Sequence, residues 1–336
     1  MSEHLLQTRD LTMHFPARGG LFRRRGGLVR AVDGVDIGVR RGETLGLVGE
    51  SGCGKSTLAR LLLRLATPTS GEVLFEGENI FAKRGAELSR LRRDVQMVFQ
   101  NPSASVNPRL SVGEIIAEPL RIQRQPDVRR RVAELMEMVG LHPDHRDRYP
   151  HEFSGGQRQR MGIARAIALR PKVVVCDEPV SALDVSIQAQ ILELLKDLQR
   201  ELGLTYVFIT HDLSVVKHLC DRVAVMYLGK VVEVAERADF FAAPAHPYTA
   251  SLLSAIPLPD PDAEARRKRV VLSGDVPSAM HPPTGCAFHP RCPKAQVRCS
   301  QDAPPPTGAG NRATSCFFPL RPGEELRSPA EDGARA

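Results

Sequence analysis

The sequence predicts an α/β fold in which a mainly parallel sheet is covered on both faces. Short apolar strands alternate with helical patterns through most of residues 1–240, and this alternation is typical of parallel sheets. A glycine-rich loop follows one of these strands and leads directly into a helix. The chain has 336 residues, of which 42% are hydrophobic and 25% charged, so it is expected to be globular and to form two compact units.

The first part of the chain predicts several strands and one helix. A strand is expected over Leu5–Phe15, and a second one contains Val35, Ile37 and Val39 at alternating positions. The glycine- and arginine-rich insertion at 18–30 is expected to be a solvated loop, with contact to a membrane surface as the alternative. Further elements are a strand at 44–48, a helix from about 58 and a small hairpin at 71–80.

The alternation of strands and helices continues through the middle of the chain. Strands are predicted at 95–99, 173–177, 205–210 and, as an adjacent pair, within 222–235. Helices are predicted within 111–140, after 154–157, over 186–202 and between the last strands. This order of elements favours the parallel sheet.

The composition changes after about residue 241. Prolines become frequent, one short helical stretch follows at 247–256, and four of the seven cysteines lie beyond it. We therefore predict a first domain at 1–240, with a helical subdomain at about 101–158, and a small Cys- and Pro-rich domain at 241–320. The last residues, 321–336, are expected to form a disordered tail.

Targeting and membrane-spanning signals are not expected in this sequence. The N-terminal stretch has no basic segment followed by an apolar run, and no window of about eighteen residues is apolar throughout. We expect no signal peptide and no transmembrane helix, and a compartment in which thiols stay reduced. The formal net charge of +7 permits an anionic partner such as nucleotide or lipid headgroups but requires none.

The most specific motif is the phosphate loop Gly49–Ser56, which fits the pattern G-x-x-x-x-G-K-[ST] between a strand and a helix. Its glycines let backbone N–H groups face phosphate oxygens at the positive end of the helix. Lys55 is expected to reach the β- and γ-phosphates, and the Ser56 hydroxyl to bind Mg²⁺. Cys53 is expected to be a spacer without thiol reactivity. The predicted nucleotide-binding residues here are Gly49, Glu50, Ser51, Gly52, Cys53, Gly54, Lys55, Ser56 and Thr57.

A second part of the same site is expected at the end of the apolar strand VVVCD. Asp177 is placed to associate with Mg²⁺, and Glu178 to orient and polarise an attacking water. Alone, a strand that ends in two carboxylates would carry little information. Together with the phosphate loop it predicts a protein that hydrolyses ATP or GTP.

The stretch FSGGQRQ indicates which class of ATP- or GTP-hydrolysing protein this is. Ser154 and Gln157 have capping-box spacing, and Gly155 and Gly156 leave a helix N-terminus open to phosphate. This stretch lies about twenty residues before Asp177. With the phosphate loop and the acidic strand end, it makes residues 1–240 resemble the ATP-binding cassette (ABC) family. The resemblance implies a P-loop NTPase fold of ABC type, with antiparallel β and helical subdomains beside the parallel core.

Further roles follow from this resemblance. Gln100 corresponds to the family's Q-loop glutamine, which contacts the catalytic Mg²⁺, and His211 to the switch histidine. Phe15 is expected to stack on adenine, with Phe22 as the alternative. The D-loop corresponds to Ser181, Ala182, Leu183 and Asp184.

The family also implies a partner for the nucleotide site. Two ATPase domains pair head to tail, so that Ser154, Gly155, Gly156 and Gln157 of one act on the ATP of the other. Because this chain carries one set of motifs, it is expected to pair with a second ATPase subunit, as a heterodimer or with itself.

Beyond the general ABC motifs, the chain resembles the oligopeptide and dipeptide importer ATPases, and their F-type subunit most. This resemblance lies in three stretches, at 100–120, 246–261 and 274–292. This resemblance extends to about residue 320. It implies two membrane permease subunits, a different second ATPase and an extracytoplasmic peptide-binding protein. It places the chain at the cytoplasmic face of the inner membrane, with no nucleic-acid partner. An importer of nickel or another small solute, and a soluble ABC ATPase, are the alternatives.

The C-terminal cysteines Cys286, Cys292, Cys299 and Cys316 are expected to be reduced rather than paired. Their spacing, C-x₅-C-x₆-C-x₁₆-C, does not fit the C-x₂₋₄-C knuckles of structural zinc sites. A zinc ion, an iron–sulfur cluster and free thiols remain open, with His289 as a further possible ligand. The resemblance to importer ATPases favours a [4Fe–4S] cluster, with zinc as the alternative.

Overall fold

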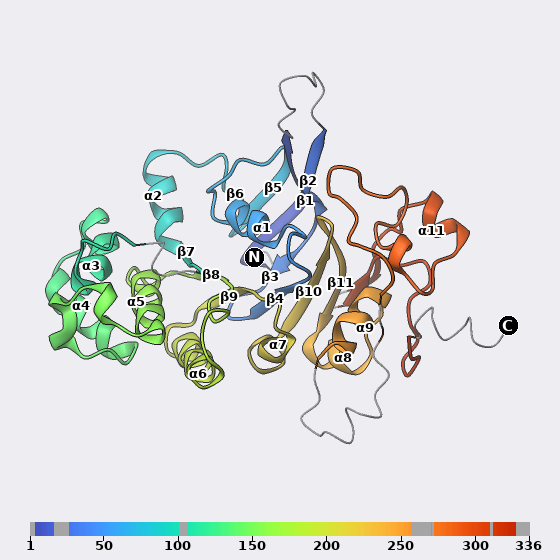
Figure 1. Cartoon of the computed structure of the whole chain (residues 1–336). Coiled ribbons are helices and arrows are strands. Elements are labelled where there is room, and N and C mark those ends of the chain that lie inside the picture. Colours follow the sequence, from blue (N-terminus) through green and yellow to red (C-terminus); the bar gives the residue numbers. More distant parts are fainter. Residues whose placement is uncertain are drawn as a thin grey trace, which may run out of the picture.

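An eight-stranded sheet forms the centre of the protein in the computed structural model (Figure 1), which describes residues 4–16, 27–100, 106–256, 270, 272–309 and 312–326. Five strands are parallel, in the order β10 (Arg222–Tyr227), β4 (Thr44–Val48), β9 (Thr205–Ile209), β8 (Val173–Asp177) and β7 (Val95–Val98). Three antiparallel strands extend the β10 edge: β11 (Lys230–Glu236), β13 (Arg312–Thr314) and β12 (Thr307–Ala309). The predicted mainly parallel α/β sheet is confirmed.

The parallel strands are buried on both faces, and their side chains divide between two hydrophobic clusters. In β8, Val173 and Val175 belong to one cluster, whereas Val174 and Cys176 belong to the other. The same two-residue period runs through β9 and β10. Continuous apolar runs such as VVVC are therefore central strands with a core on each side.

One face of the sheet is covered by a helix and a second, antiparallel sheet. The helix α1 (Lys55–Leu62) buries Leu58, Leu61 and Leu62. The second sheet consists of β1 (Leu6–Pro16), β2 (Leu28–Val35), β3 (Gly38–Val39), β5 (Ser70–Phe75) and β6 (Glu78–Asn79). Residues 17–26 of the arginine-rich insertion, including Phe22, lie outside the described part of the chain.

The strand expected to contain Val35, Ile37 and Val39 is divided into β2 and β3. The hydroxyl of Thr8 interrupts the ladder: it donates to the Val35 carbonyl oxygen at 2.8 Å and accepts the Ile37 N–H at 3.0 Å. Both halves still pair with β1. Two hydrogen bonds of the Thr8 hydroxyl thus bridge the break between β2 and β3.

Helices cover the other face. The helices next to the sheet are α5 (Gly155–Ile167), α6 (Val185–Leu202) and α7 (Leu213–Leu219). The helical region predicted within 111–140 consists of α3 (Val112–Ile122) and α4 (Val128–Met138), which pack with α5 into a group at one end of the molecule (Figure 1). A helix not predicted from the sequence, α2 (Gly85–Asp94), buries only Leu91 fully and Leu88 partly, so its apolar stripe is short.

The C-terminal region joins the opposite end of the sheet (Figure 1). Its described helices are α8 (Arg237–Ala242), α9 (Pro247–Ser254) and α11 (Val297–Gln301). Strand β13 pairs with β11, and Phe240, Tyr248 and Phe288 are buried in the same cluster as the helices of the core. The carboxylate of Glu233 accepts the N–H groups of Ala245 and His246, both at 2.8 Å. The C-terminal region is therefore packed continuously onto the central sheet.

Among the described helices, none combines the length and the apolar character that a bilayer crossing requires.

Candidate nucleotide site

The predicted site residues follow the carboxyl ends of four neighbouring parallel strands. Strand β4 leads into the phosphate loop, β9 precedes His211, β8 ends at Asp177 before Glu178, and β7 precedes Gln100 by two residues. Because parallel strands end at the same edge, segments more than 150 residues apart meet there; Gly49 and His211 are separated by 162 positions (211 − 49).

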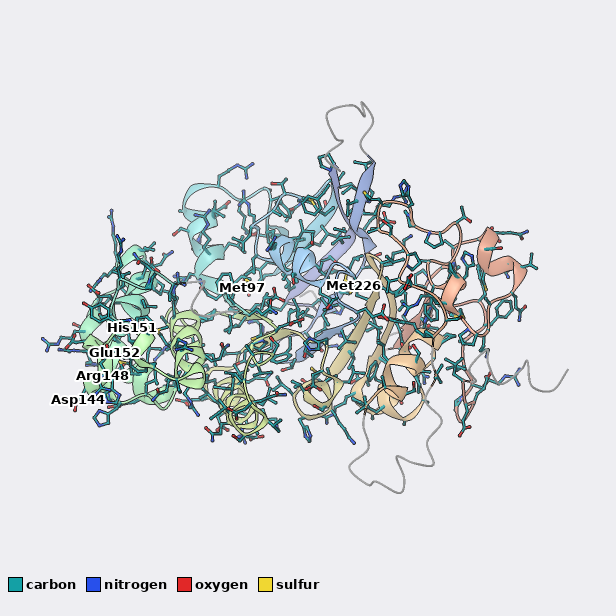
Figure 2. The ribbon with its side chains drawn as sticks, in the orientation of Figure 1. Met97, Asp144, Arg148, His151, Glu152 and Met226 are labelled. Atoms are coloured by element: carbon teal, nitrogen blue, oxygen red, sulfur yellow. The ribbon has the colours of Figure 1, made fainter. Side chains whose placement is uncertain are left out.

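Two glycines allow the phosphate loop to pass close to other backbone. Gly49 has φ 152° and Gly54 φ 108°, both in the region that favours glycine. A Cβ atom on Gly49 would lie 2.1 Å from the carbonyl oxygen of Met226, which Figure 2 labels in β10. A Cβ atom on Gly54 would lie 2.0 Å from the carbonyl oxygen of Ala31. Side chains at these positions would therefore collide with β10 and β2.

Lys55 is a buried cation at the start of α1. Its Nζ donates to the carbonyl oxygens of Gly49 at 2.7 Å and Glu50 at 3.0 Å. Within the described residues no carboxylate pairs with this ammonium, and the N-cap, Gly54, offers no side chain to the first N–H groups of the helix. A buried ammonium beside an open helix N-terminus is a site for an anion such as phosphate. Burial raises the pKa of the Cys53 thiol, which agrees with its expected role as an unreactive spacer.

Ser56 and Asp177 lie together beneath the loop. The Ser56 hydroxyl donates to Oδ1 of Asp177 at 3.3 Å. Burial raises the pKa of Asp177, the Ser56 hydrogen bond opposes that shift, and the charge of Glu178 adds to it. A hydroxyl and a carboxylate are hard oxygen donors of the kind that Mg²⁺ prefers, and a cation here would stabilise the ionised carboxylate.

Glu178 is held through both carboxylate oxygens. Gln100 Nε2 donates to Oε2 at 2.9 Å, and His211 Nδ1 lies 3.2 Å from Oε1. The backbone of Glu178 has φ 45°, which is strained for a residue with a side chain, and its N–H donates to the Ile209 carbonyl oxygen at 2.9 Å. The structure thus fixes a carboxylate between an amide and an imidazole, an arrangement that can accept a proton from water.

The signature residues lie on the helical group, at the N-terminus of α5. The Ser154 hydroxyl accepts the Gln157 N–H at 3.3 Å, and Gln157 Oε1 accepts the Ser154 N–H at 2.9 Å, which completes the predicted capping box. A Cβ atom on Gly156 would lie 2.5 Å from Ile187 Cγ2. In the described part of the chain, no hydrogen bond joins these residues to the phosphate loop of the same chain.

The D-loop connects Glu178 to α6. Ser181 Oγ donates to the Glu178 carbonyl oxygen at 3.1 Å, and Asp184 caps α6 by accepting the Ile187 N–H at 3.0 Å. Ala182 is exposed and Leu183 half-buried between them. Phe15, the expected adenine platform, lies in β1 opposite Val29 and is 39% exposed.

Two residues outside the ATPase motifs reach the phosphate loop from the C-terminal region. The Tyr248 hydroxyl accepts the Glu50 N–H at 2.9 Å, and the Arg291 guanidinium donates to both carboxylate oxygens of Glu50 at 2.9 and 3.2 Å. These contacts span 198 and 241 residues, so no local pattern could reveal them.

The four C-terminal cysteines line one small pocket. Cys286, Cys292, Cys299 and Cys316 surround it together with His289, and all seven cysteines of the chain have free thiols. As they stand in the described structure, no three His, Cys, Asp or Glu side chains form a group that could hold a metal ion.

Comparison with known proteins identifies the family. The model described as ABC transporter matches residues 32–181, and the model described as oligopeptide/dipeptide transporter, C-terminal region, matches residues 232–299. The putative oligopeptide transport ATP-binding protein YkfD of Bacillus subtilis (strain 168) is 53% identical over 89% of this chain and 91% of that protein. The dipeptide transport ATP-binding protein DppF of Escherichia coli (strain K12) is 50% identical over 94% of this chain and 95% of that protein.

Solved structures agree with this result. The cbiO1 protein of Clostridium perfringens, part of an ABC transporter complex, matches with a TM-score of 0.62 and 30% identity over 72% of this chain and 92% of that one. A dimeric ATP-binding cassette in a post-hydrolysis state, bound to ADP and phosphate, matches with a TM-score of 0.61 and 30% identity over 69% of this chain and 98% of that one.

The phosphate loop and the acidic strand end at the edge of the sheet, together with the signature sequence at the start of α5, define an ATPase of the ATP-binding cassette class, which uses ATP and Mg²⁺. The chain belongs to the family of ABC transporter ATP-binding proteins, in the group with the oligopeptide and dipeptide transporter C-terminal region.

The packing of the phosphate loop predicts different effects for two glycine substitutions. Gly49→Ala should abolish ATP binding, because its methyl group would collide with the Met226 carbonyl oxygen. In Gly52→Ala the methyl group would meet no atom within 4 Å, and only the φ of +80° would cost about 1–2 kcal/mol. Equilibrium titration with MgATP measures both affinities, and equal losses in the two variants would contradict the packing argument.

Proposed function

We propose that this chain is the ATP-hydrolysing subunit of an importer that carries di- and oligopeptides across the cytoplasmic membrane. One observation carries the proposal: a complete set of ABC ATPase motifs is joined in one chain to the C-terminal region of oligopeptide and dipeptide transporters. The curated relatives reported above are named for oligopeptide or dipeptide transport.

The geometry of the site supports a role for each residue in hydrolysis. Lys55 and the loop N–H groups bind the phosphates, and Ser56 with Asp177 provides oxygen ligands for Mg²⁺. Glu178 accepts a proton from the water that attacks the γ-phosphate. Its contacts with Gln100 and His211, at 2.9 and 3.2 Å, support positioning roles for these two residues.

We further propose that the site is completed by a second ATPase subunit. Ser154, Gly155, Gly156 and Gln157 of each subunit act on the ATP held by its partner's phosphate loop. Within the described residues no hydrogen bond joins these residues to the phosphate loop of their own chain, which supports this arrangement, as does the dimeric state of one solved neighbour. We propose that the partner is a different chain of the same class, and that residues 1–240 form the ATPase domain and 241–320 an appended domain.

A groove next to Gln100 supports docking of a membrane permease subunit. The groove has a volume of about 340 Å³ and lies between β7 and the helices α3 and α5. Met97 of β7, labelled in Figure 2, lines it, and so do Leu65, Phe99 and Ile122, which are 62, 37 and 72% exposed. Apolar side chains with this exposure suit a protein partner. Docking here would place the chain at the cytoplasmic face of the membrane and connect the permease to Glu178 through Gln100.

Glu178→Gln tests the catalytic assignment in the assembled transporter. The amide cannot accept a proton, so hydrolysis and peptide uptake should fall by about 10²-fold or more, whereas ATP binding should persist. Glu193→Gln, at a surface position paired with Lys196, is the matched control and should retain full activity. The measurements are ATP hydrolysis and accumulation of labelled di- and oligopeptides in vesicles that hold the permease subunits and the binding protein.

The outcomes of this experiment test the catalytic assignment and the substrate assignment separately. Undiminished turnover by Glu178→Gln would rule out this carboxylate as the base. If the wild-type complex hydrolyses ATP but accumulates nickel or another small solute instead of peptides, the substrate assignment is wrong and the ATPase assignment stands.

We also propose a metal centre at the four C-terminal cysteines. Four thiols around one pocket form a donor set that suits either a [4Fe–4S] cluster or zinc, with the cluster favoured. Burial raises the pKa of Cys292 to about 12 and that of Cys316 to about 11, so both thiols are protonated at neutral pH until a metal displaces the protons. The side chains would have to move closer together to bind it.

Metal analysis after anaerobic purification of the full chain tests this centre. We expect about four iron and four sulfide per chain with a visible absorbance band, and loss of both in Cys292→Ser. Cys176→Ala, which alters a buried cysteine outside the pocket, should retain them. Stoichiometric zinc without iron would mean that the centre is a zinc site and not an iron–sulfur cluster. The absence of both metals would contradict the proposal.

A further inference from the structure

Every polar group of Glu50, the second residue of the phosphate loop, is engaged by another residue. Its N–H donates to the Tyr248 hydroxyl at 2.9 Å, and its carbonyl oxygen accepts from Lys55 Nζ at 3.0 Å. Its carboxylate accepts two hydrogen bonds from Arg291, at 2.9 and 3.2 Å. Two of these three partners come from the C-terminal region, beyond the ATPase motifs.

The partners in the C-terminal region are themselves fixed by packing. Arg291 ends the short turn His289–Arg291, and its side chain is 10% exposed. Tyr248 is fully buried, with its ring centroid 4.7 Å from that of Tyr227 and 5.3 Å from that of Phe288. A bidentate guanidinium–carboxylate pair on such a support is both strong and directional.

The pair also solves an electrostatic problem of the loop. Glu50 introduces a negative charge into the segment that receives a triphosphate, and an unpaired carboxylate there would repel the ligand. Arg291 compensates this charge. A guanidinium keeps its charge throughout the physiological pH range, so this compensation does not depend on pH there.

We infer that Arg291 and Tyr248 are positioning residues of the ATP site. They fix the first turn of the phosphate loop, and Arg291 neutralises Glu50 so that the triphosphate can bind. The inference rests on the proposed function, because it assumes that the loop binds ATP. It also gives the C-terminal region a task in nucleotide binding, since both residues belong to that region and contact Glu50 directly.

MgATP titration of the full-length chain and of four variants tests the inference. Arg291→Gln leaves the Glu50 charge unpaired and should weaken ATP binding about tenfold or more, with a raised KM and a nearly unchanged kcat in the assembled complex. Glu50→Gln removes the repelling charge and should cost less. The double variant Glu50→Gln/Arg291→Gln should bind ATP more tightly than Arg291→Gln alone. Arg298→Gln, at an exposed arginine of the same region that pairs with Asp302, is the control and should match the wild type.

The rescue by the double variant separates charge compensation from a merely structural role. If the two single losses add in the double variant, or if folded Arg291→Gln binds ATP like the wild type, the inference is wrong. Should Arg291→Gln fail to fold, Arg291→Lys and Tyr248→Phe test the inference in its place, because each retains most of the packing. Both variants should still weaken ATP binding severalfold. A wild-type chain that binds no ATP would instead refute the proposed function.

Discussion

The close approach of the phosphate loop to neighbouring backbone is the constraint on which the ATP site depends. Gly49 passes the carbonyl oxygen of Met226, and Gly54 that of Ala31, at distances that leave no room for a side chain. On this path Lys55 begins α1, and the N-cap Gly54 leaves the first N–H groups of the helix without a side-chain partner. The parallel register of β4, β9, β8 and β7 then determines which side chains meet the loop.

Two further parts of the molecule contact the nucleotide site from opposite ends of the sheet. The helical group carries the signature residues and, through the D-loop, connects them to the backbone of Glu178. The C-terminal region reaches Glu50 with Tyr248 and Arg291. Both the helical group and the C-terminal region are therefore in contact with residues of one nucleotide site.

The strands that lead into the catalytic motifs can be predicted from the sequence, because each is an apolar run followed by a polar residue. The strand VVVCD followed by Glu178 is an example, and its place beside β9 follows from the parallel sheet. The α2 helix is not predicted, because its apolar stripe consists of Leu91 and the partly buried Leu88 among mostly charged residues. The contacts of Arg291 and Tyr248 with Glu50 could not be predicted either, since they depend on how β13 and α9 join the sheet.

Titration of the wild-type chain and of Lys55→Ala with MgATP tests the central claim most directly. If the loop binds the phosphates through this buried ammonium, Lys55→Ala should bind ATP at least about tenfold more weakly than the wild type. Lys196→Ala, at a surface lysine paired with Glu193, should bind ATP as the wild type does. An ATP affinity unchanged by Lys55→Ala would contradict the account of the site given above.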